Sequence, residues 1–208
     1  MSKIAVIKYN AGNIQSVLFA LERLGVTAIW TDDPGEIRRA DYVIFPGVGE
    51  ASSAMRHLRE RGLDVVIREL RQPVLGICLG LQLFCRHSEE NDTECLGIFN
   101  VDVRKFNGAD GRLKVPHMGW NTLQQLQGPL FEGIQAESYA YFVHSYFAEI
   151  SQETIATTDY GTPFSAALQH ENFYAVQFHP EKSGTTGQRI LHNFLRLTAY
   201  GGRPTIDG

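Results

Sequence analysis

The segment PVLGICLGLQ, residues 73–82, joins a strand pattern to a helix pattern through one cysteine. Its apolar residues run almost without a break up to the cysteine, which is typical of a buried strand, and a helix is expected from Leu79. Cys78 lies at the corner, with Gly76 and Gly80 two positions away on either side. This spacing resembles a nucleophile elbow, a tight turn whose small flanking residues let the nucleophile project. The segment therefore predicts a strand, a strained turn and a helix, with a nucleophilic cysteine between them.

Two physical effects would activate Cys78 in such a turn. The N-terminus of a helix carries partial positive charge, which favours a thiolate over a thiol. The backbone N–H of Leu79 would also point at an oxyanion formed on a substrate carbonyl. The alternative is a buried cysteine in a glycine-lined turn, because cysteine is often buried. Cys85 and Cys95 lack this setting, and we interpret them as structural.

Strand and helix patterns alternate outward from this segment, which predicts a mostly parallel sheet with helices on both faces. Asn13 is the expected N-cap of the first helix, and Gly62 weakens the second. The second half is rich in short β patterns separated by turn signals. We expect one α/β domain over residues 1–208, in which 201–208 form a frayed tail. The predicted strands are 3–9, 26–30, 41–45, 73–77, 101–106, 139–148, 154–158, 164–169 and 173–178, and the predicted helices are 14–24, 52–70, 79–88 and 186–197.

A candidate base follows the last predicted strand, in the segment VQFHPEKSG at 176–184. His179 ends the strand and Glu181 comes two residues later. A cysteine nucleophile needs a base and a group that orients this base. A carboxylate this close can hold one imidazole nitrogen while the other faces a thiol. Because ligand sites form at the carboxyl ends of parallel strands, we expect His179 near Cys78. The alternative is a strand-end histidine beside a surface glutamate.

A third segment, PGVG at 46–49, follows the strand predicted over 41–45. Closely spaced glycines let a backbone approach a ligand or turn an N–H toward it. Beside an elbow cysteine, the segment is a candidate second donor of an oxyanion hole. The alternative is an ordinary Pro-Gly turn.

Composition excludes several classes of function. The 19 Lys and Arg against 23 Asp and Glu give a net charge of −4, which offers no basic face for nucleic acid. No apolar run approaches the roughly 20 residues of a membrane span, and the start is too short for a signal peptide. The odd count of three cysteines suits a reducing cytoplasm. No cluster has metal-ligand spacing and no phosphate-binding loop occurs, so neither a metal nor a nucleotide cofactor is expected.

Taken together, the three segments resemble the class I (triad) glutamine amidotransferases. Three further segments narrow the resemblance to the glutaminase subunits of imidazole glycerol phosphate synthases: NAGN at 10–13, KVPHMGWN at 114–121 and YFVHSY at 141–146. The resemblance implies a flavodoxin-like fold over nearly the whole chain. The sequence departs from the family at position 11, where it has alanine and the family often has proline. This difference affects the stiffness of the loop and leaves the chemistry unchanged.

The resemblance also implies roles for individual residues. Cys78 corresponds to the nucleophile, His179 to the general acid and base, and Glu181 to the group that orients His179. Val48 and Leu79 correspond to the oxyanion hole, whose strand undergoes a peptide flip in this family before it becomes competent. The implied substrate-binding residues are Gly47, Gly49, Gln82, His144, Ser145 and Tyr146, and the implied partner-interface residues are Asn13, Trp120, Tyr141 and Lys182.

The implied reaction is the hydrolysis of L-glutamine to glutamate and ammonia through a cysteinyl thioester. The ammonia would pass to a (βα)₈-barrel cyclase, which makes imidazole glycerol phosphate and an aminoimidazole carboxamide ribotide in histidine biosynthesis. Low activity without this partner is expected, because a free glutaminase wastes glutamine. Three rivals stay open: a glutaminase that feeds a different synthase, a cysteine hydrolase of similar fold, and a binding module without catalysis. Trp120 and Tyr141 could also be core aromatics, Gln82 a solvated helix residue and Lys182 an ordinary surface charge.

Overall fold

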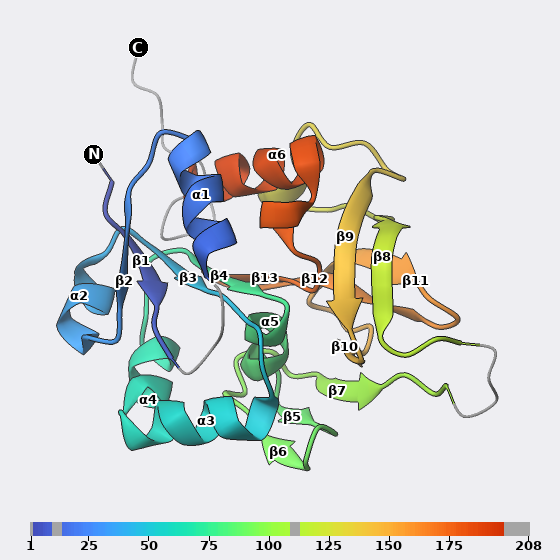
Figure 1. The fold of residues 1–208 in the computed structure, drawn as a ribbon, viewed down its shortest axis with the longest axis horizontal. Coiled ribbons are helices and arrows are strands. Elements are labelled where there is room, and N and C mark those ends of the chain that lie inside the picture. Colours follow the sequence, from blue (N-terminus) through green and yellow to red (C-terminus); the bar gives the residue numbers. More distant parts are fainter. Residues whose placement is uncertain (1, 10–13, 109–112, 198–208) are drawn as a thin grey trace.

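A seven-stranded sheet runs through this computed structural model, which describes residues 2–9, 14–108 and 113–197 (Figure 1). Its strands are β1 (Ile4–Ile7), β2 (Ala28–Thr31), β3 (Tyr42–Phe45), β4 (Val74–Ile77), β11 (Thr154–Asp159), β12 (Pro163–His170) and β13 (Phe173–Val176). They lie in the order β11-β12-β13-β4-β3-β1-β2. Neighbours from β13 to β2 are parallel, whereas β12 and β11 add on antiparallel. The predicted α/β class with a mostly parallel sheet is confirmed.

Helices cover both faces of this sheet (Figure 1). One face carries α1 (Gln15–Arg23) and α6 (Gly184–Phe194), and the other carries α2 (Pro34–Arg39), α3 (Ala51–Glu60), α4 (Leu63–Arg68) and α5 (Leu79–Phe84). Alternate residues of β1 therefore enter two different hydrophobic clusters, with Ile4 and Val6 in one and Ala5 and Ile7 in the other. This double burial explains why the central strands are almost continuously apolar.

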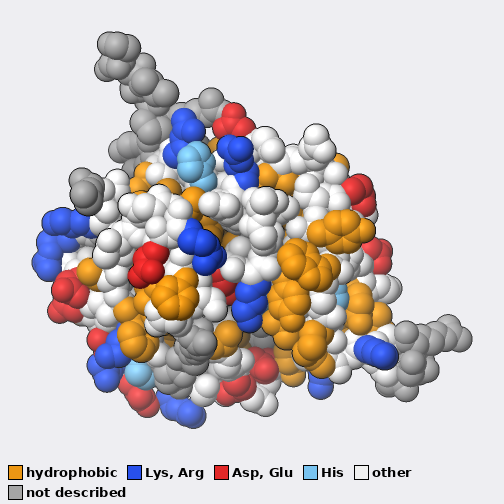
Figure 2. All heavy atoms as spheres, turned by 45° about the horizontal axis from the view of Figure 1, so that its top comes forward, with side chains coloured by type: hydrophobic (Ala, Val, Ile, Leu, Met, Phe, Trp, Pro, Cys, Tyr) orange, Lys and Arg blue, Asp and Glu red, His pale blue; other side chains and the backbone are white. Residues whose placement is uncertain are grey.

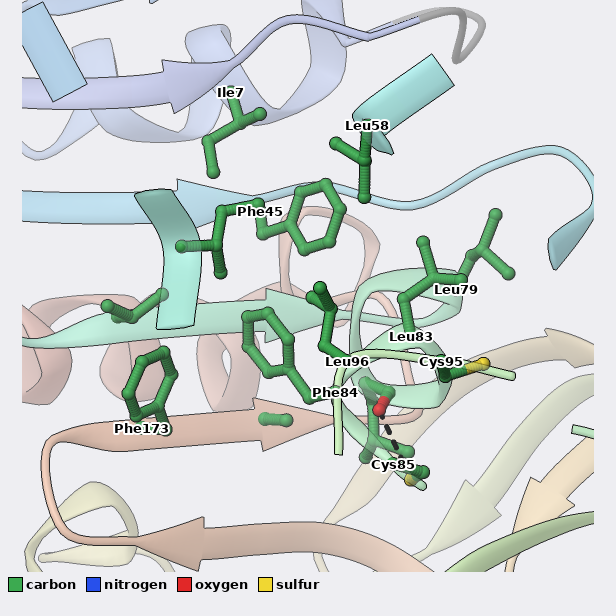
Figure 3. Packing of buried hydrophobic residues seen from close by; sticks show 14 of the residues in the cluster. Ile7, Phe45, Leu58, Leu79, Leu83, Phe84, Cys85, Cys95, Leu96 and Phe173 are labelled. Carbon is green, nitrogen blue, oxygen red and sulfur yellow. Dashed lines mark hydrogen bonds between the residues drawn. The ribbon is translucent and has the colours of Figure 1, made fainter. Parts of the chain in front are cut away.

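Three phenylalanines anchor α5 against the sheet (Figure 3). The ring of Phe84 on α5 lies 5.5 Å from that of Phe45 on β3 and 5.6 Å from that of Phe173 on β13. All three side chains are buried. The helix that follows Cys78 is thus fixed against the two strands that flank β4, and the turn at its start is fixed with it.

Two smaller sheets and two short 3₁₀ turns complete the structure. The four-stranded sheet has the order β10-β7-β5-β6, and β8 pairs antiparallel with β9. The elements are β5 (His87–Ser88), β6 (Thr93–Glu94), β7 (Asp102–Lys105), β8 (His117–Thr122), β9 (Tyr139–His144), β10 (Tyr146–Ala148), η1 (Pro129–Phe131) and η2 (Pro180–Lys182). In the described residues, no helix has both the length and the apolar character needed to cross a membrane.

The helix predicted over 79–88 is wrong in its second half, because α5 ends at Phe84. A returning segment takes the carbonyls that another helical turn would need. The N–H of Leu96 donates to the oxygen of Leu83 (2.9 Å), and the N–H of Phe99 donates to that of Phe84 (2.9 Å). Residues 87–88 instead form β5.

The remaining differences are local. The helix predicted over 52–70 is divided at Gly62, whose positive φ of 64° separates α3 from α4. The strand predicted over 139–148 is two strands with Ser145 between them. Sequence reasoning missed α2, which starts with Pro34 and Gly35, and β8, which contains a glycine. Ile14 stands at the N-cap position of α1 and makes no side-chain cap hydrogen bond; Asn13, the predicted cap, and the predicted tail 201–208 lie outside the described residues.

Candidate active site

Cys78 lies in a strained turn between β4 and α5, with φ 52° and ψ −106°. Left-handed backbone is costly for a residue with a side chain, and such strain is concentrated at functional sites. The turn is also closely packed: a Cβ on Gly80 would lie 2.2 Å from the carbonyl oxygen of Phe45, and one on Gly47 would lie 2.3 Å from the backbone nitrogen of Gly80. The small flanking residues that the elbow pattern requires are therefore needed here for steric reasons.

His179 lies close to this turn because β13 and β4 are parallel neighbours, paired up to Val176 and Ile77. Nδ1 of His179 lies 2.7 Å from Oε1 of Glu181, and both side chains are buried. Burial lowers the pKa of His179, but Cys78 and Glu181 raise it more strongly, so that it reaches about 10. Nε2 has no hydrogen-bond partner among the described residues. The structure brings the predicted nucleophile, base and carboxylate together.

Ser183 holds the His179 loop against β9, and sequence reasoning missed it. Its hydroxyl donates to the carbonyl oxygen of His179 (2.7 Å) and accepts from the N–H of Tyr141 (2.9 Å). The N–H of His179 also donates to the carbonyl oxygen of Tyr141 (2.9 Å). The position of His179 is thus tied to the strand that carries Tyr141.

A cavity of about 350 Å³ opens at Cys78 and His179. Every predicted substrate or oxyanion residue contributes to its lining: Gly47, Val48, Gly49, Leu79, Gln82, His144, Ser145 and Tyr146. Glu181 lies behind His179 and does not line the cavity. Pro116, Val143 and Glu90 also line it and were not predicted.

Glu90 is the acidic group of this cavity. One of its carboxylate oxygens accepts from the N–H of Ala51 (2.8 Å), and burial raises its pKa. A carboxylate in the cavity that contains Cys78 suits a ligand that carries an ammonium group. Glu90 lies in the turn between β5 and β6, where the sequence shows no signal other than a common acidic residue.

The loop that follows β3 is held by a tyrosine. The hydroxyl of Tyr9 donates to the carbonyl oxygen of Pro46 (2.7 Å), and the tyrosine is buried. Leu79 is the first residue of α5, so its N–H has no acceptor within the helix. Val48 and Leu79 both line the cavity that contains the sulfur.

The side-chain amide of Gln82 already has hydrogen-bond partners within the protein. It is buried, so the solvated-residue alternative is wrong. Its Nε2 donates to the carbonyl oxygen of Tyr146 (2.8 Å) and to Oε1 of Gln177 (3.2 Å). Since an amide nitrogen has two hydrogens, only the carbonyl of Gln82 is left for a ligand.

His144 and His117 form a buried pair, with Nε2 of His144 3.0 Å from Nδ1 of His117. Nδ1 of His144 donates to the carbonyl oxygen of Tyr146 (2.8 Å), so its Nε2 must accept from His117. Burial lowers the pKa of His117 to about 4 and that of His144 to about 3. Both rings are therefore neutral at pH 7 and serve as hydrogen-bond links.

Exposed aromatic side chains lie on one face of β8 and β9, on the side of the molecule where Figure 2 shows hydrophobic side chains together. Trp120 is 56% exposed and meets Tyr141 edge to face, with ring centroids 5.9 Å apart. Nζ of Lys182 lies 5.9 Å from the centroid of the Tyr141 ring. The core-aromatic alternative is therefore wrong for Trp120, and exposed apolar surface of this kind marks interaction sites. Asn13, the fourth predicted interface residue, lies outside the described residues.

The fold and the site define an α/β protein in which a buried cysteine and a histidine–glutamate pair meet at one cavity. The family profile "Glutamine amidotransferase class-I" matches residues 5–197. Two solved structures share the fold: a putative GMP synthase component from Thermoplasma acidophilum (TM-score 0.71, 22% identity, 94% of this chain and 92% of that one) and a glutamine amidotransferase (TM-score 0.70, 20% identity, 92% and 96%). The chain belongs to the class-I glutamine amidotransferase family.

The comparison with curated proteins is more specific. The chain is 60% identical to imidazole glycerol phosphate synthase subunit HisH of Bacteroides fragilis over 195 residues, which covers 94% of this chain and all of that protein. It is 46% identical to the HisH subunit of Idiomarina loihiensis over 94% of this chain and 98% of that one. Within the class, it is a member of the HisH family.

Proposed function

We propose that this chain is the glutaminase subunit of imidazole glycerol phosphate synthase and supplies ammonia for histidine biosynthesis. The observation that carries the proposal is the convergence of Cys78 and the His179–Glu181 pair on one cavity, at the ends of two adjacent parallel strands. The names of its relatives support the same assignment. The cytoplasm is the proposed compartment, because all three cysteines are unpaired thiols.

The proposed reaction is acyl transfer to sulfur. The proton of the Cys78–His179 pair lies on His179, in agreement with the raised pKa of this imidazole, and the thiolate sulfur attacks the side-chain amide carbon of glutamine. The oxyanion is stabilised by the N–H groups of Val48 and Leu79. The C–N bond then breaks as His179 gives its proton to the leaving nitrogen, which releases ammonia and leaves a glutamyl thioester.

Hydrolysis of the thioester completes the cycle. His179 takes a proton from water, and the hydroxide attacks the thioester carbonyl. The C–S bond breaks, glutamate leaves, and the proton taken from water stays on His179 beside the regenerated thiolate. Glu181 stabilises the imidazolium in both halves, in agreement with its effect on the pKa of His179.

Recognition of glutamine is assigned to charged and amide groups of the cavity. The carboxylate of Glu90 would face the α-ammonium group, and the free carbonyl of Gln82 would accept a further hydrogen bond. In a peptide substrate cleaved at an internal peptide bond, the corresponding nitrogen is part of an amide and carries no charge, so Glu90 would have no ammonium partner. The cavity thus favours a free amino acid over a peptide, which counts against a peptidase.

The proposal is tested by glutamate release from glutamine, measured with the chain alone and with a purified (βα)₈-barrel cyclase subunit. We expect release to rise about tenfold or more with the cyclase and its ligand, because Val48, one of the two oxyanion donors, lies in a loop after β3 that a partner can reposition. Equal turnover in both conditions would support glutaminase activity but contradict its activation by the cyclase subunit. A different synthase in a pull-down would favour the rival within the same class.

The interface part of the proposal predicts an effect at Trp120. We expect Trp120→Ala to weaken cyclase binding by about 30-fold, since exposed tryptophans at the centre of an interface dominate binding. The chain has one other tryptophan, Trp30 on β2, which is 47% exposed and lies at the opposite edge of the sheet from β11. Trp30→Ala is the matched control, expected to bind normally in calorimetric titration. Equal losses in both variants would contradict the assignment of this face.

A further inference from the structure

A buried glutamine lies directly behind the reactive cysteine. Gln177 is fully buried, follows β13, and its backbone N–H donates to the carbonyl oxygen of Ala166 on β12 (2.8 Å). Its side-chain Nε2 lies 3.7 Å from the sulfur of Cys78. The reaction described above assigns it no role.

The orientation of the Gln177 amide is set by its neighbours. Nε2 of Gln82 donates to Oε1 of Gln177, so the oxygen of this amide must face Gln82 and its NH₂ group must face Cys78. Gln82 is oriented in turn by the carbonyl oxygen of Tyr146, which can only accept. A chain of donors and acceptors with one consistent direction therefore ends on the sulfur.

Besides His179, which interacts with Cys78 and favours its thiolate, two polar groups contact the sulfur, and they favour opposite protonation states. The thiol of Cys78 lies 3.8 Å from the carbonyl oxygen of Val143 and can donate only while it keeps its proton. Gln177 donates toward the sulfur, and such a bond strengthens when the sulfur becomes negative. Of these two contacts, the one with Gln177 stabilises the nucleophilic form.

We propose that Gln177 is a positioning residue that holds the Cys78 sulfur toward the cavity and stabilises its thiolate, with its amide oriented by Gln82. For catalysis this inference rests on the proposed glutaminase function. The thiolate itself can be measured without that function.

The test is the pH dependence of alkylation of Cys78 by iodoacetamide, followed by mass spectrometry of the peptide that contains Cys78. Gln177→Met keeps the length of the side chain and removes the N–H donor. We expect the alkylation midpoint to rise by about one pH unit, since a hydrogen bond to a charged group has about this effect. With glutamine, kcat is expected to fall about tenfold at unchanged KM.

Two further variants make the result interpretable. Gln177→Asn keeps the amide but withdraws it from the sulfur by one methylene, and it is expected to raise the midpoint in the same direction. Gln169→Met on β12, a half-buried glutamine whose amide donates to the hydroxyl of Tyr174 (3.3 Å), is the matched control and should leave the midpoint unchanged. Circular dichroism identifies any variant that fails to fold.

An unchanged midpoint in a folded Gln177 variant would overturn the inference, even if kcat fell, because a purely structural loss does not alter thiolate formation. If the alkylation midpoint rose in the Gln177 variants but the unchanged protein released no glutamate, the positioning role would be supported and the proposed glutaminase function would be refuted. The two failures are thus distinguishable.

Discussion

Replacement of Cys78 by alanine is expected to lower glutamate release by about 10⁴-fold or more, because no other group in the cavity can form the thioester. The cavity, His179 and the oxyanion donors would remain. The variant should therefore still bind glutamine, with an affinity near that of the unchanged protein. Release is measured with saturating glutamine and saturating cyclase subunit, and binding by calorimetric titration.

Cys95→Ala is the matched control for this variant. Cys95 is a buried thiol outside the cavity, and burial raises its pKa to about 12. We expect this control to keep near-full activity. Appreciable release by Cys78→Ala would refute the nucleophile assignment, and loss of activity in both variants would point to a fold defect instead.

Replacement of Gly47 by alanine has the second largest expected effect. The added Cβ would lie 2.3 Å from the backbone nitrogen of Gly80 and 2.6 Å from the carbonyl oxygen of Ile77. Both are backbone atoms of the turn that holds Cys78, and neither can yield without moving the nucleophile. The loop that carries Val48 must therefore shift, and the loss of one oxyanion donor lowers kcat by about 10²–10³-fold.

Gly35→Ala is the control for this substitution. An added Cβ there meets the guanidinium end of Arg39 at 3.0 Å and the carboxylate of Asp33 at 3.1 Å, and both are ends of side chains that can move. The measurement is kcat with the cyclase subunit present, together with thermal unfolding of each variant. If Gly47→Ala turned over glutamine normally, Val48 would not be an oxyanion donor.

The elements around Cys78 could be predicted from the sequence because their signals are local. A continuous apolar run, two glycines at fixed spacing and a helical period are sufficient to define the strand, the turn and the start of the helix at 73–79. The parallel order of strands also follows from alternation along the chain. Together they led to the expectation that Cys78 and His179 share an edge of the sheet, and they do.

The end of α5 and the presence of β8 could not be predicted in this way. The helix stops because residues 96 and 99 return to take its carbonyls, which is a contact between segments and has no local signal. Strand β8 contains Gly119 at φ 130°, a conformation that side chains rarely adopt and that weakens any strand pattern. Its pairing with β9 stabilises it.

For the polar network behind the sulfur, the sequence likewise indicates that a side chain is buried but does not indicate its partners. A glutamine within the apolar run FYAVQF at 173–178 is a signal that Gln177 is buried and bonded, but the run does not identify its partner. The partners Gln82 and Cys78 lie 95 and 99 positions away. The same holds for His117 and His144, which are 27 positions apart.

The α/β class, the elbow cysteine and the histidine–glutamate pair could be read from the sequence, because each depends on residues within about one element of one another. Three features of the site emerge only from the packed fold: Glu90 in the cavity, Ser183 bonded to the backbone of His179, and the amide of Gln177 turned toward Cys78. The physical reason is that a hydrogen bond depends on the direction and distance of two groups in space. For residues far apart in the chain, these are set only when the sheet and its helices pack together.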